Sequence, residues 1–189
     1  MIRIIAGKYK GRRLKLVPSP LVRPLPAKLK EALFNTLQDR ILDTFFLDGF
    51  AGTGSVGLEA LSRGAGRVVF VEELPLAAKI IKANISKCGA DESALVANRE
   101  FNRAVIDLAK KGVKFDLIFL DPPYKLLAER NPLKIIRKRG VLKPEGMVIV
   151  RHNRRFLPSK DDFKLLRQVK FRDDVFSFYS GEIVKREKS

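Results

Sequence analysis

From residue 44 onward the sequence alternates between short apolar segments and helical segments, and this pattern limits the possible fold more than any other feature. The predicted strands are 45–47, 67–71, 94–97, 117–120 and 147–150, and the predicted helices are 56–63, 75–87, 102–111 and 132–138. Short apolar strands that alternate with helices form a parallel sheet covered on both faces. We therefore expect an α/β fold that binds its ligands beyond the carboxyl ends of the strands.

The segments at the two ends of this core have other patterns. Hairpins are predicted from strands at 2–6 and 13–17 and from strands at 165–171 and 175–184, and a helix is predicted over 27–39. The second hairpin is antiparallel and is expected at the edge of the sheet. The chain is interpreted as an N-terminal hairpin and helix extension, 1–43, followed by one α/β domain, 44–189.

The charge of the chain favours a polyanionic partner. There are 38 lysines and arginines against 21 aspartates and glutamates, a formal net charge of +17. Cations that neutralise phosphates release bound counterions, which favours association with nucleic acid. A solubilising surface is the alternative reading. The basic residues gather in segments 8–13, 137–139 and 151–155, and this clustering favours nucleic acid.

The same composition argues against several other classes. Cys88 is the only cysteine, so no intrachain disulfide can form, and a single histidine makes a zinc site unexpected. No apolar run is long enough to cross a bilayer, and the first residues do not resemble a signal peptide. We expect a cytoplasmic protein that binds neither membrane nor metal.

The first candidate site is the segment Asp48-Gly49-Phe50-Ala51-Gly52-Thr53-Gly54, between a predicted strand and a predicted helix. Small residues allow a tight turn and a close approach of the backbone to a ligand at the helix N-terminus. The segment lacks the Gly-Lys-Ser/Thr of a P-loop and the Gly-x-Gly-x-x-Gly of a dinucleotide site. A purely structural turn is the alternative.

Glu72 is the second candidate, because it ends the next predicted strand and follows Asp48 by 24 residues. An acidic side chain at about this spacing accepts hydrogen bonds from ribose hydroxyls in nucleotide-binding α/β folds. The alternative is that Glu72 or Glu73 only caps the helix that begins near Pro75.

The third candidate is Asp121-Pro122-Pro123-Tyr124, which follows the strand predicted at 117–120. Proline cannot donate to a strand ladder and restricts the residue before it, so the strand must end here. Asp121 and nearby backbone carbonyls can then accept hydrogen bonds from a substrate amine, and Tyr124 can stack on its base. An ordinary Pro-Pro turn is the alternative.

With these motifs in this order, the chain resembles the amino-methyltransferases that carry an Asp/Asn-Pro-Pro-Tyr/Phe motif. It is more closely similar to the RsmD-type family, which methylates the exocyclic amine of a guanine in 16S ribosomal RNA. The likeness covers most of the chain and includes segments 3–12, 23–24, 30–35 and 57–64. The resemblance implies a Rossmann-like, seven-stranded fold that uses S-adenosylmethionine.

The resemblance also implies roles for the cofactor residues. Asp48 and the loop Gly49–Gly54 would surround the methionine part of the cofactor, and Glu72 would hold its ribose. Glu100 and Phe101 stand where the family usually has an Asp-Ala pair, so Glu100 is a candidate ligand of the adenine.

At the reacting end, the resemblance implies that Asp121 and Tyr124 position the guanine amine, with the Pro122 carbonyl as a second acceptor. Arg151 and His152 stand where an acidic residue is common in the family. We expect His152 to be exposed or to face RNA rather than to act as a general base.

The implied activity is methyl transfer to the 2-amino group of a guanine in 16S rRNA, in a particle of the assembling small subunit. A DNA adenine amino-methyltransferase is one alternative, although a chain of 189 residues leaves no room for a large target-recognition insert. A non-catalytic, basic RNA-binding or ribosome-assembly module is the other.

Overall fold

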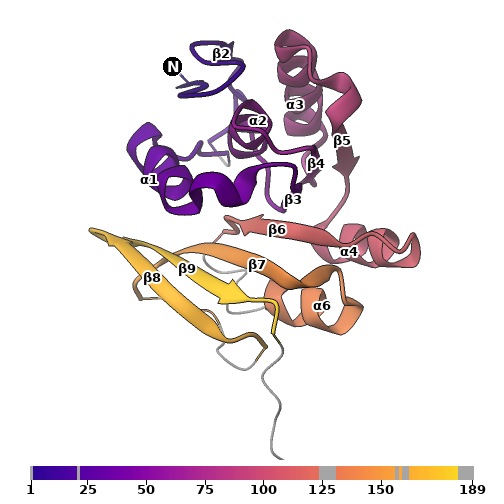
Figure 1. Ribbon diagram of the computed structural model, residues 1–189. Helices are drawn as coiled ribbons and strands as arrows, with labels where there is room; N and C mark the ends of the chain where they lie inside the picture. The colour runs from indigo at the N-terminus through magenta and orange to yellow at the C-terminus, as the bar shows by residue number, and fades with distance from the viewer. Residues whose placement is uncertain (1, 21, 124–130, 156–157, 159–161, 183–189) are drawn as a thin grey trace, which may run out of the picture. The chain divides into compact units, whose positions relative to one another are not determined.

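The computed structural model describes residues 2–20, 22–123, 131–155, 158 and 162–182. It divides into two compact units, Met1–Ala104 and Val105–Ser189. Figure 1 labels most of the helices and strands of both units along the chain. Within the described residues, no helix combines the length and the apolar character that crossing a membrane requires.

The first unit begins with the predicted hairpin. Strands β1 (Ile2–Arg3) and β2 (Arg13–Leu14) pair antiparallel, although both are shorter than the sequence predicted. Gly7 allows the turn because its φ is +80° and a Cβ there would lie 1.7 Å from the Ser62 carbonyl oxygen. The chain therefore passes closer to residue 62 than any side chain would permit.

Helix α1 (Ala27–Leu37) follows the proline-rich connector and ends in a short 3₁₀ helix, η1 (Gln38–Ile41). The sequence predicted a helix over 27–39, and the buried apolar residues of α1 recur at helical spacing along one face. These residues are Leu29, Leu33, Phe34 and Leu37.

The rest of the first unit is a three-stranded parallel sheet with its crossover helices. In chain order the elements are β3 (Phe45–Asp48), α2 (Ser55–Ser62), β4 (Arg67–Glu72), α3 (Pro75–Cys88), η2 (Asp91–Ser93) and β5 (Ala94–Asn98). The strands lie in the order β5-β4-β3. Asp48 ends β3 opposite Phe70, and Glu72 ends β4 opposite Asn98, so both carboxylates lie at the carboxyl edge. Helix α4 (Phe101–Lys110) spans the boundary between the units.

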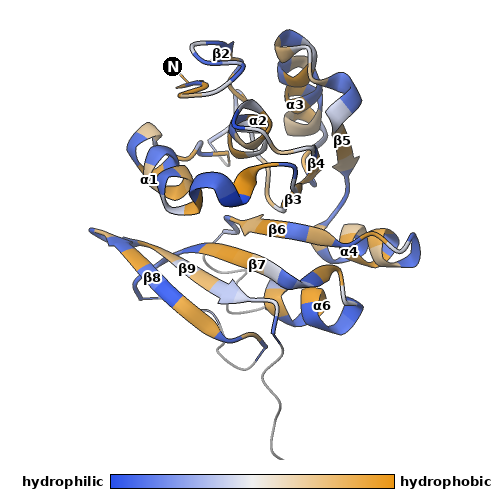
Figure 2. Cartoon of the chain, viewed as in Figure 1, coloured by the Kyte–Doolittle hydropathy of each residue, from blue (hydrophilic) through white to orange (hydrophobic). Residues whose placement is uncertain are grey.

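The second unit contains a four-stranded mixed sheet. Its elements are β6 (Phe115–Leu120), α6 (Pro132–Arg139), β7 (Leu142–Asn153), β8 (Leu165–Phe171) and β9 (Asp174–Ser180). The strands lie in the order β6-β7-β9-β8, with β6 and β7 parallel and the others antiparallel. Figure 2 shows that β6 is mostly apolar, whereas apolar and polar residues are mixed along β8.

The predicted secondary structure of the α/β core is confirmed. Strand and helix alternate as the sequence indicated, and β8 and β9 form the predicted antiparallel hairpin. The prediction for His152 is wrong. The side chain is 0% exposed, and its Nε2 lies 2.7 Å from the Ser177 hydroxyl. Burial lowers the pKa of His152, so the imidazole is held neutral within the sheet.

Candidate active site

Asp48 is the buried first residue of the candidate loop, and it binds the backbone of the helix that follows the loop. Its side chain is 1% exposed, and Oδ2 accepts a hydrogen bond of 2.9 Å from the Gly57 N–H. Gly57 lies in the first turn of α2, where backbone N–H groups have no partner within the helix. The carboxylate therefore ties the end of β3 to the start of α2, and it faces the positive end of that helix.

The segment Gly49–Gly54 makes the tight turn that its small residues predict. Gly52 and Gly54 both have positive φ, at +56° and +76°. A Cβ on Gly52 would lie 3.1 Å from the Val22 side chain, and one on Gly54 would lie 3.2 Å from Ile81. Glycine is required here by conformation and by close packing.

Glu72 holds this loop in place. Its Oε2 accepts a hydrogen bond of 2.8 Å from Gly52 N–H, and its Oε1 accepts one of 2.9 Å from Leu74 N–H. The second hydrogen bond is made at the start of α3, because Leu74 is the N-cap residue of that helix. Burial raises the pKa of the Glu72 carboxyl, and the backbone donors of Leu74, Gly52 and Glu73 oppose that rise. The side chain is half-buried, so it still has a face toward solvent.

Glu100 and Phe101 lie where α4 begins. The Glu100 carboxylate accepts a hydrogen bond of 3.1 Å from Arg103 N–H, as an N-cap residue does. Phe101 is buried and stacks on Phe50 of the candidate loop, with ring centroids 4.8 Å apart and an interplanar angle of 25°. The structure thus brings two predicted cofactor residues together in an apolar pair that sequence spacing did not predict.

Asp121 follows directly after β6, so its carboxylate lies beyond the carboxyl end of the strand as predicted. The side chain is 18% exposed, and both of its oxygens accept hydrogen bonds from Arg151 Nη1, at 2.9 and 3.2 Å. Pro122 is buried and Pro123 is exposed. Burial raises the pKa of Asp121, and the Arg151 guanidinium opposes the rise. Tyr124 lies outside the described residues.

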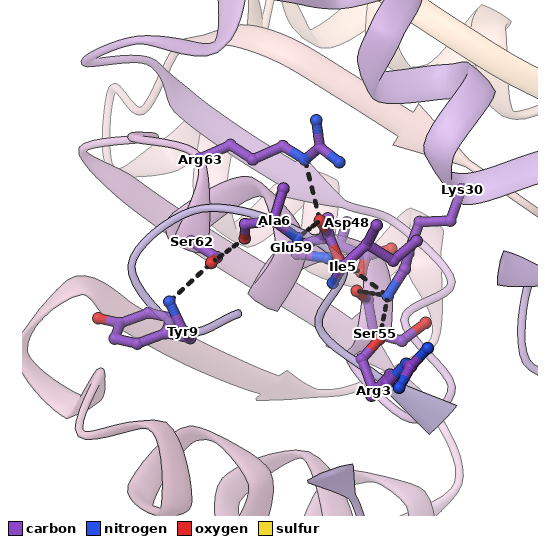
Figure 3. Close-up of polar contacts among 11 residues, drawn as sticks. Arg3, Ile5, Ala6, Tyr9, Lys30, Asp48, Ser55, Glu59, Ser62 and Arg63 are labelled. Carbon is purple, nitrogen blue, oxygen red and sulfur yellow. Dashed lines mark hydrogen bonds and ion pairs between the residues drawn. The ribbon is translucent and has the colours of Figure 1, made fainter. Parts of the chain in front are cut away.

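The hairpin of β1 and β2, which carries the basic segment 8–13, is anchored through its backbone. Its charged side chains are therefore left exposed to solvent. Tyr9 is buried, its N–H donates to the Ser62 hydroxyl over 2.9 Å, and Figure 3 shows this contact. Lys8 Nζ and the Arg12 guanidinium each lie 5.5 Å from the centroid of the Tyr9 ring. The exposed cations of the basic segment 8–13, in the turn of this hairpin, are Lys8, Lys10, Arg12 and Arg13.

A carboxylate that sequence reasoning did not single out holds the hairpin to α2. Glu59 is 0% exposed and accepts hydrogen bonds from the N–H groups of Ile5 and Ala6, at 2.8 and 3.0 Å. Lys30 Nζ and Arg63 Nε also lie 3.0 and 2.9 Å from its oxygens, as Figure 3 shows. All of α2 is buried, and a carboxylate among the apolar residues of such a helix is a signal that could have marked Glu59 as paired.

Comparison with known proteins identifies the family. A family model described as Conserved hypothetical protein 95 matches residues 2–180. The chain belongs to this family. It is the RsmD-type family that the sequence predicted. The chain is 36% identical over 154 residues to Ribosomal RNA small subunit methyltransferase D of Haemophilus influenzae, covering 79% of this chain and 77% of that protein.

Solved structures confirm the methyltransferase fold of this RsmD-type chain. The Escherichia coli protein yhhF superposes with a TM-score of 0.83 at 30% identity, over 97% of this chain and 99% of that one. An RNA methyltransferase from Salinibacter ruber, solved with S-adenosyl-L-homocysteine, has the same fold. Its TM-score is 0.68 at 14% identity, over 87% of this chain and 98% of that one. The predicted Rossmann-like α/β class is correct.

Proposed function

We propose that this protein transfers a methyl group from S-adenosylmethionine to the exocyclic 2-amino group of a guanine in 16S rRNA. The protein is an RsmD-type, S-adenosylmethionine-dependent methyltransferase, and its relative in Haemophilus influenzae is named for the small-subunit ribosomal RNA. The observation that carries methyl transfer to an exocyclic amine is the Asp121 carboxylate, largely buried directly beyond β6 and followed by two prolines. The choice of guanine rests on the RsmD-type family. Such an acceptor suits an exocyclic amine.

The residues of the first unit fit the cofactor. S-adenosylmethionine supplies a methyl group already activated on a sulfonium, so the protein has only to bind and align it. Asp48 and the loop Gly49–Gly54 hold the methionine part, where the glycines bring the backbone close. Glu72 accepts from the ribose hydroxyls, because its carboxylate is half-buried and offers about four acceptor sites, which its three backbone donors do not fill. Glu100 and Phe101 serve the adenine.

The residues of the second unit act on the base. Asp121 accepts a hydrogen bond from the guanine amine, with the Pro122 carbonyl as the second acceptor, and Tyr124 stacks on the ring. These bonds favour the pyramidal, more nucleophilic form of the nitrogen and stabilise the positive charge that develops on it. The guanine must leave its stack to reach such a site, as bases do in enzymes that modify them.

The N-terminal extension, 1–43, is proposed to contact RNA and to be distinct from the catalytic domain, 44–189. The exposed cations of the hairpin bind phosphates rather than base edges. Neutralising Lys8, Lys10, Arg12 and Arg13 together should weaken RNA binding. The slope of log affinity against log salt should fall by nearly one unit for each lost phosphate contact. An unchanged slope would refute the role.

The substrate is tested by methyl transfer from labelled cofactor to purified small-subunit particles, to free 16S rRNA and to DNA. The proposal expects label in the particle or in the rRNA, at the N2 position of one guanine. Label in DNA adenine would support a DNA methyltransferase, and binding of RNA without any transfer would support a non-catalytic module. A ribosomal substrate also implies a cytoplasmic protein.

A further inference from the structure

Arg151 lies between two carboxylates of the second unit. Its Nη1 donates to both oxygens of Asp121, while Nε and Nη2 donate to Asp174 Oδ1 at 3.0 and 2.8 Å. The three side chains are 14%, 18% and 27% exposed, for Arg151, Asp121 and Asp174. One cation is thus shared by two largely buried anions.

The strand register explains why these residues meet. Leu120 of β6 lies level with Val150 of β7, so Asp121 comes level with Arg151 one position later. Across the antiparallel pair, Asn153 lies opposite Asp174. Arg151 and Asn153 share one face of β7, which makes Arg151 and Asp174 diagonal neighbours on that face.

The guanidinium is suited to this position. It carries its charge at every accessible pH, and its planar fork directs two donors at Asp174 while a third nitrogen serves Asp121. A carboxylate offers about four acceptor sites, and Arg151 occupies two of those of Asp121. Acceptor capacity for a substrate amine therefore remains on Asp121.

We propose that Arg151, anchored by Asp174, is a positioning residue that orients the Asp121 carboxylate for methyl transfer. The inference rests on the proposed function, because it presumes that Asp121 accepts from the substrate amine. Orientation follows from the geometry: one nitrogen holds both oxygens, so the carboxylate cannot rotate without breaking a hydrogen bond. Asp174 in turn prevents Arg151 from following the carboxylate.

The same arrangement controls the charge of Asp121. Arg151 and Asp174 are the charged groups that act on Asp121 in the described part of the chain, and they act in opposite directions. Burial raises the pKa of the carboxyl and Arg151 lowers it. Removing the guanidinium should raise this pKa further, because the opposing positive charge is lost. The ionised form would then exist only at higher pH.

The test compares Arg151→Met, Arg151→Lys and Asp174→Asn with a matched control, Lys143→Met. Lys143 pairs with Asp116 over 2.8 Å on the same two strands, β6 and β7, at their other end. Single-turnover methyl transfer is measured from pH 5 to 9, beside cofactor titration and urea unfolding. In parallel, the Asp121 carboxyl is titrated by carbon NMR in the protein without RNA.

We expect Arg151→Met to transfer methyl about tenfold more slowly at pH 7, with the acidic limb of its rate profile moved to higher pH. Arg151→Lys should restore the position of the limb but not the full rate, because an ammonium lacks the fork. Asp174→Asn should lose part of the rate, because Arg151 is no longer anchored. It should move the acidic limb to lower pH, because the Asp174 charge raises the pKa of Asp121. Cofactor affinity should not change, and Lys143→Met should match the wild type.

The proposal is overturned if Arg151→Met keeps the rate and pH profile of Lys143→Met, even when both lose stability. It is also overturned if the Asp121 carboxyl titrates alike with and without Arg151. Failure of the proposed function looks different: the wild type then methylates no rRNA guanine, while the carboxyl titration still reports whether Arg151 acts on Asp121.

Discussion

Glu59 and Asp121 are both carboxylates held by basic side chains, yet their surroundings differ in two ways. Glu59 is fully buried and accepts four hydrogen bonds, two on each oxygen, which fills its acceptor sites. Asp121 keeps part of its surface exposed and gives two acceptor sites to Arg151.

The ratio of cations to carboxylates also differs between the two sites. Two cations, Lys30 and Arg63, surround the single carboxylate of Glu59, whereas Asp121 and Asp174 share the single cation Arg151. A carboxylate with excess positive charge and no acceptor capacity can only hold the fold together. A carboxylate that shares its cation and retains acceptor capacity can still act on a ligand.

The largest effect is expected from Glu59→Ala. Removing this carboxylate leaves Lys30 buried without its counter-charge and leaves two backbone donors without acceptors. We expect the free energy of unfolding to fall by about 3–5 kcal/mol in urea titrations. Glu31→Ala, which removes an exposed carboxylate of α1, should change it little. Equal stability of the two variants would contradict the anchoring role.

Asp121→Ala tests the catalytic carboxylate of this comparison. The loss should appear in the rate of methyl transfer, by about 2.7–4 kcal/mol or a hundredfold to a thousandfold, by analogy with other lost transition-state contacts. Asp121→Asn should keep partial activity, because its carbonyl still accepts one hydrogen bond. Single-turnover transfer and cofactor titration are measured on each variant. Wild-type transfer by the alanine variant would make Asp121 only a turn residue.

Glu72 combines the structural role of Glu59 with the ligand-binding role proposed for Asp121. It holds the loop at Gly52, and its carboxylate is only half-buried. Glu72→Ala should weaken S-adenosylmethionine binding by about 1–3 kcal/mol, the cost of losing hydrogen bonds to a charged group. Calorimetry with the cofactor measures this, with Glu73→Ala at the exposed neighbour as the control. If both variants bind equally well, the ribose role is wrong.

The smallest effect concerns His152, a titratable group that is buried without any charged partner in the described contacts. Its folded-state pKa lies below the ordinary value, so the unfolded chain binds the proton more readily. Stability should therefore fall as the pH drops through about 6.5 toward the lower folded-state pKa. In His152→Gln this acid-dependent loss should shrink, as measured by urea unfolding at pH 7.5 and 5. Equal pH dependence in both proteins would refute it.

Local patterns in the sequence determined much of the fold. The alternation of strands and helices predicted the core, because burial of both faces of a strand requires a continuous apolar run. Pro122 and Pro123 placed Asp121 just beyond a strand, since proline cannot continue a ladder. Glycine at positions 52 and 54 predicted the tight loop. Each of these inferences depends only on residues near one another in the chain.

Tertiary structure decided which distant side chains meet. Arg151 and Asp174 become neighbours through strand register, and Glu59 reaches the backbone of residues 5 and 6 from α2. His152 shows the same limit: the comparison with the family pattern led us to expect exposure, but alternation along β7 turned its side chain toward Ser177. Register is set by the packing of whole strands, and a shift of one residue reverses every side chain. Local sequence determines the elements, whereas their register determines which charges are paired.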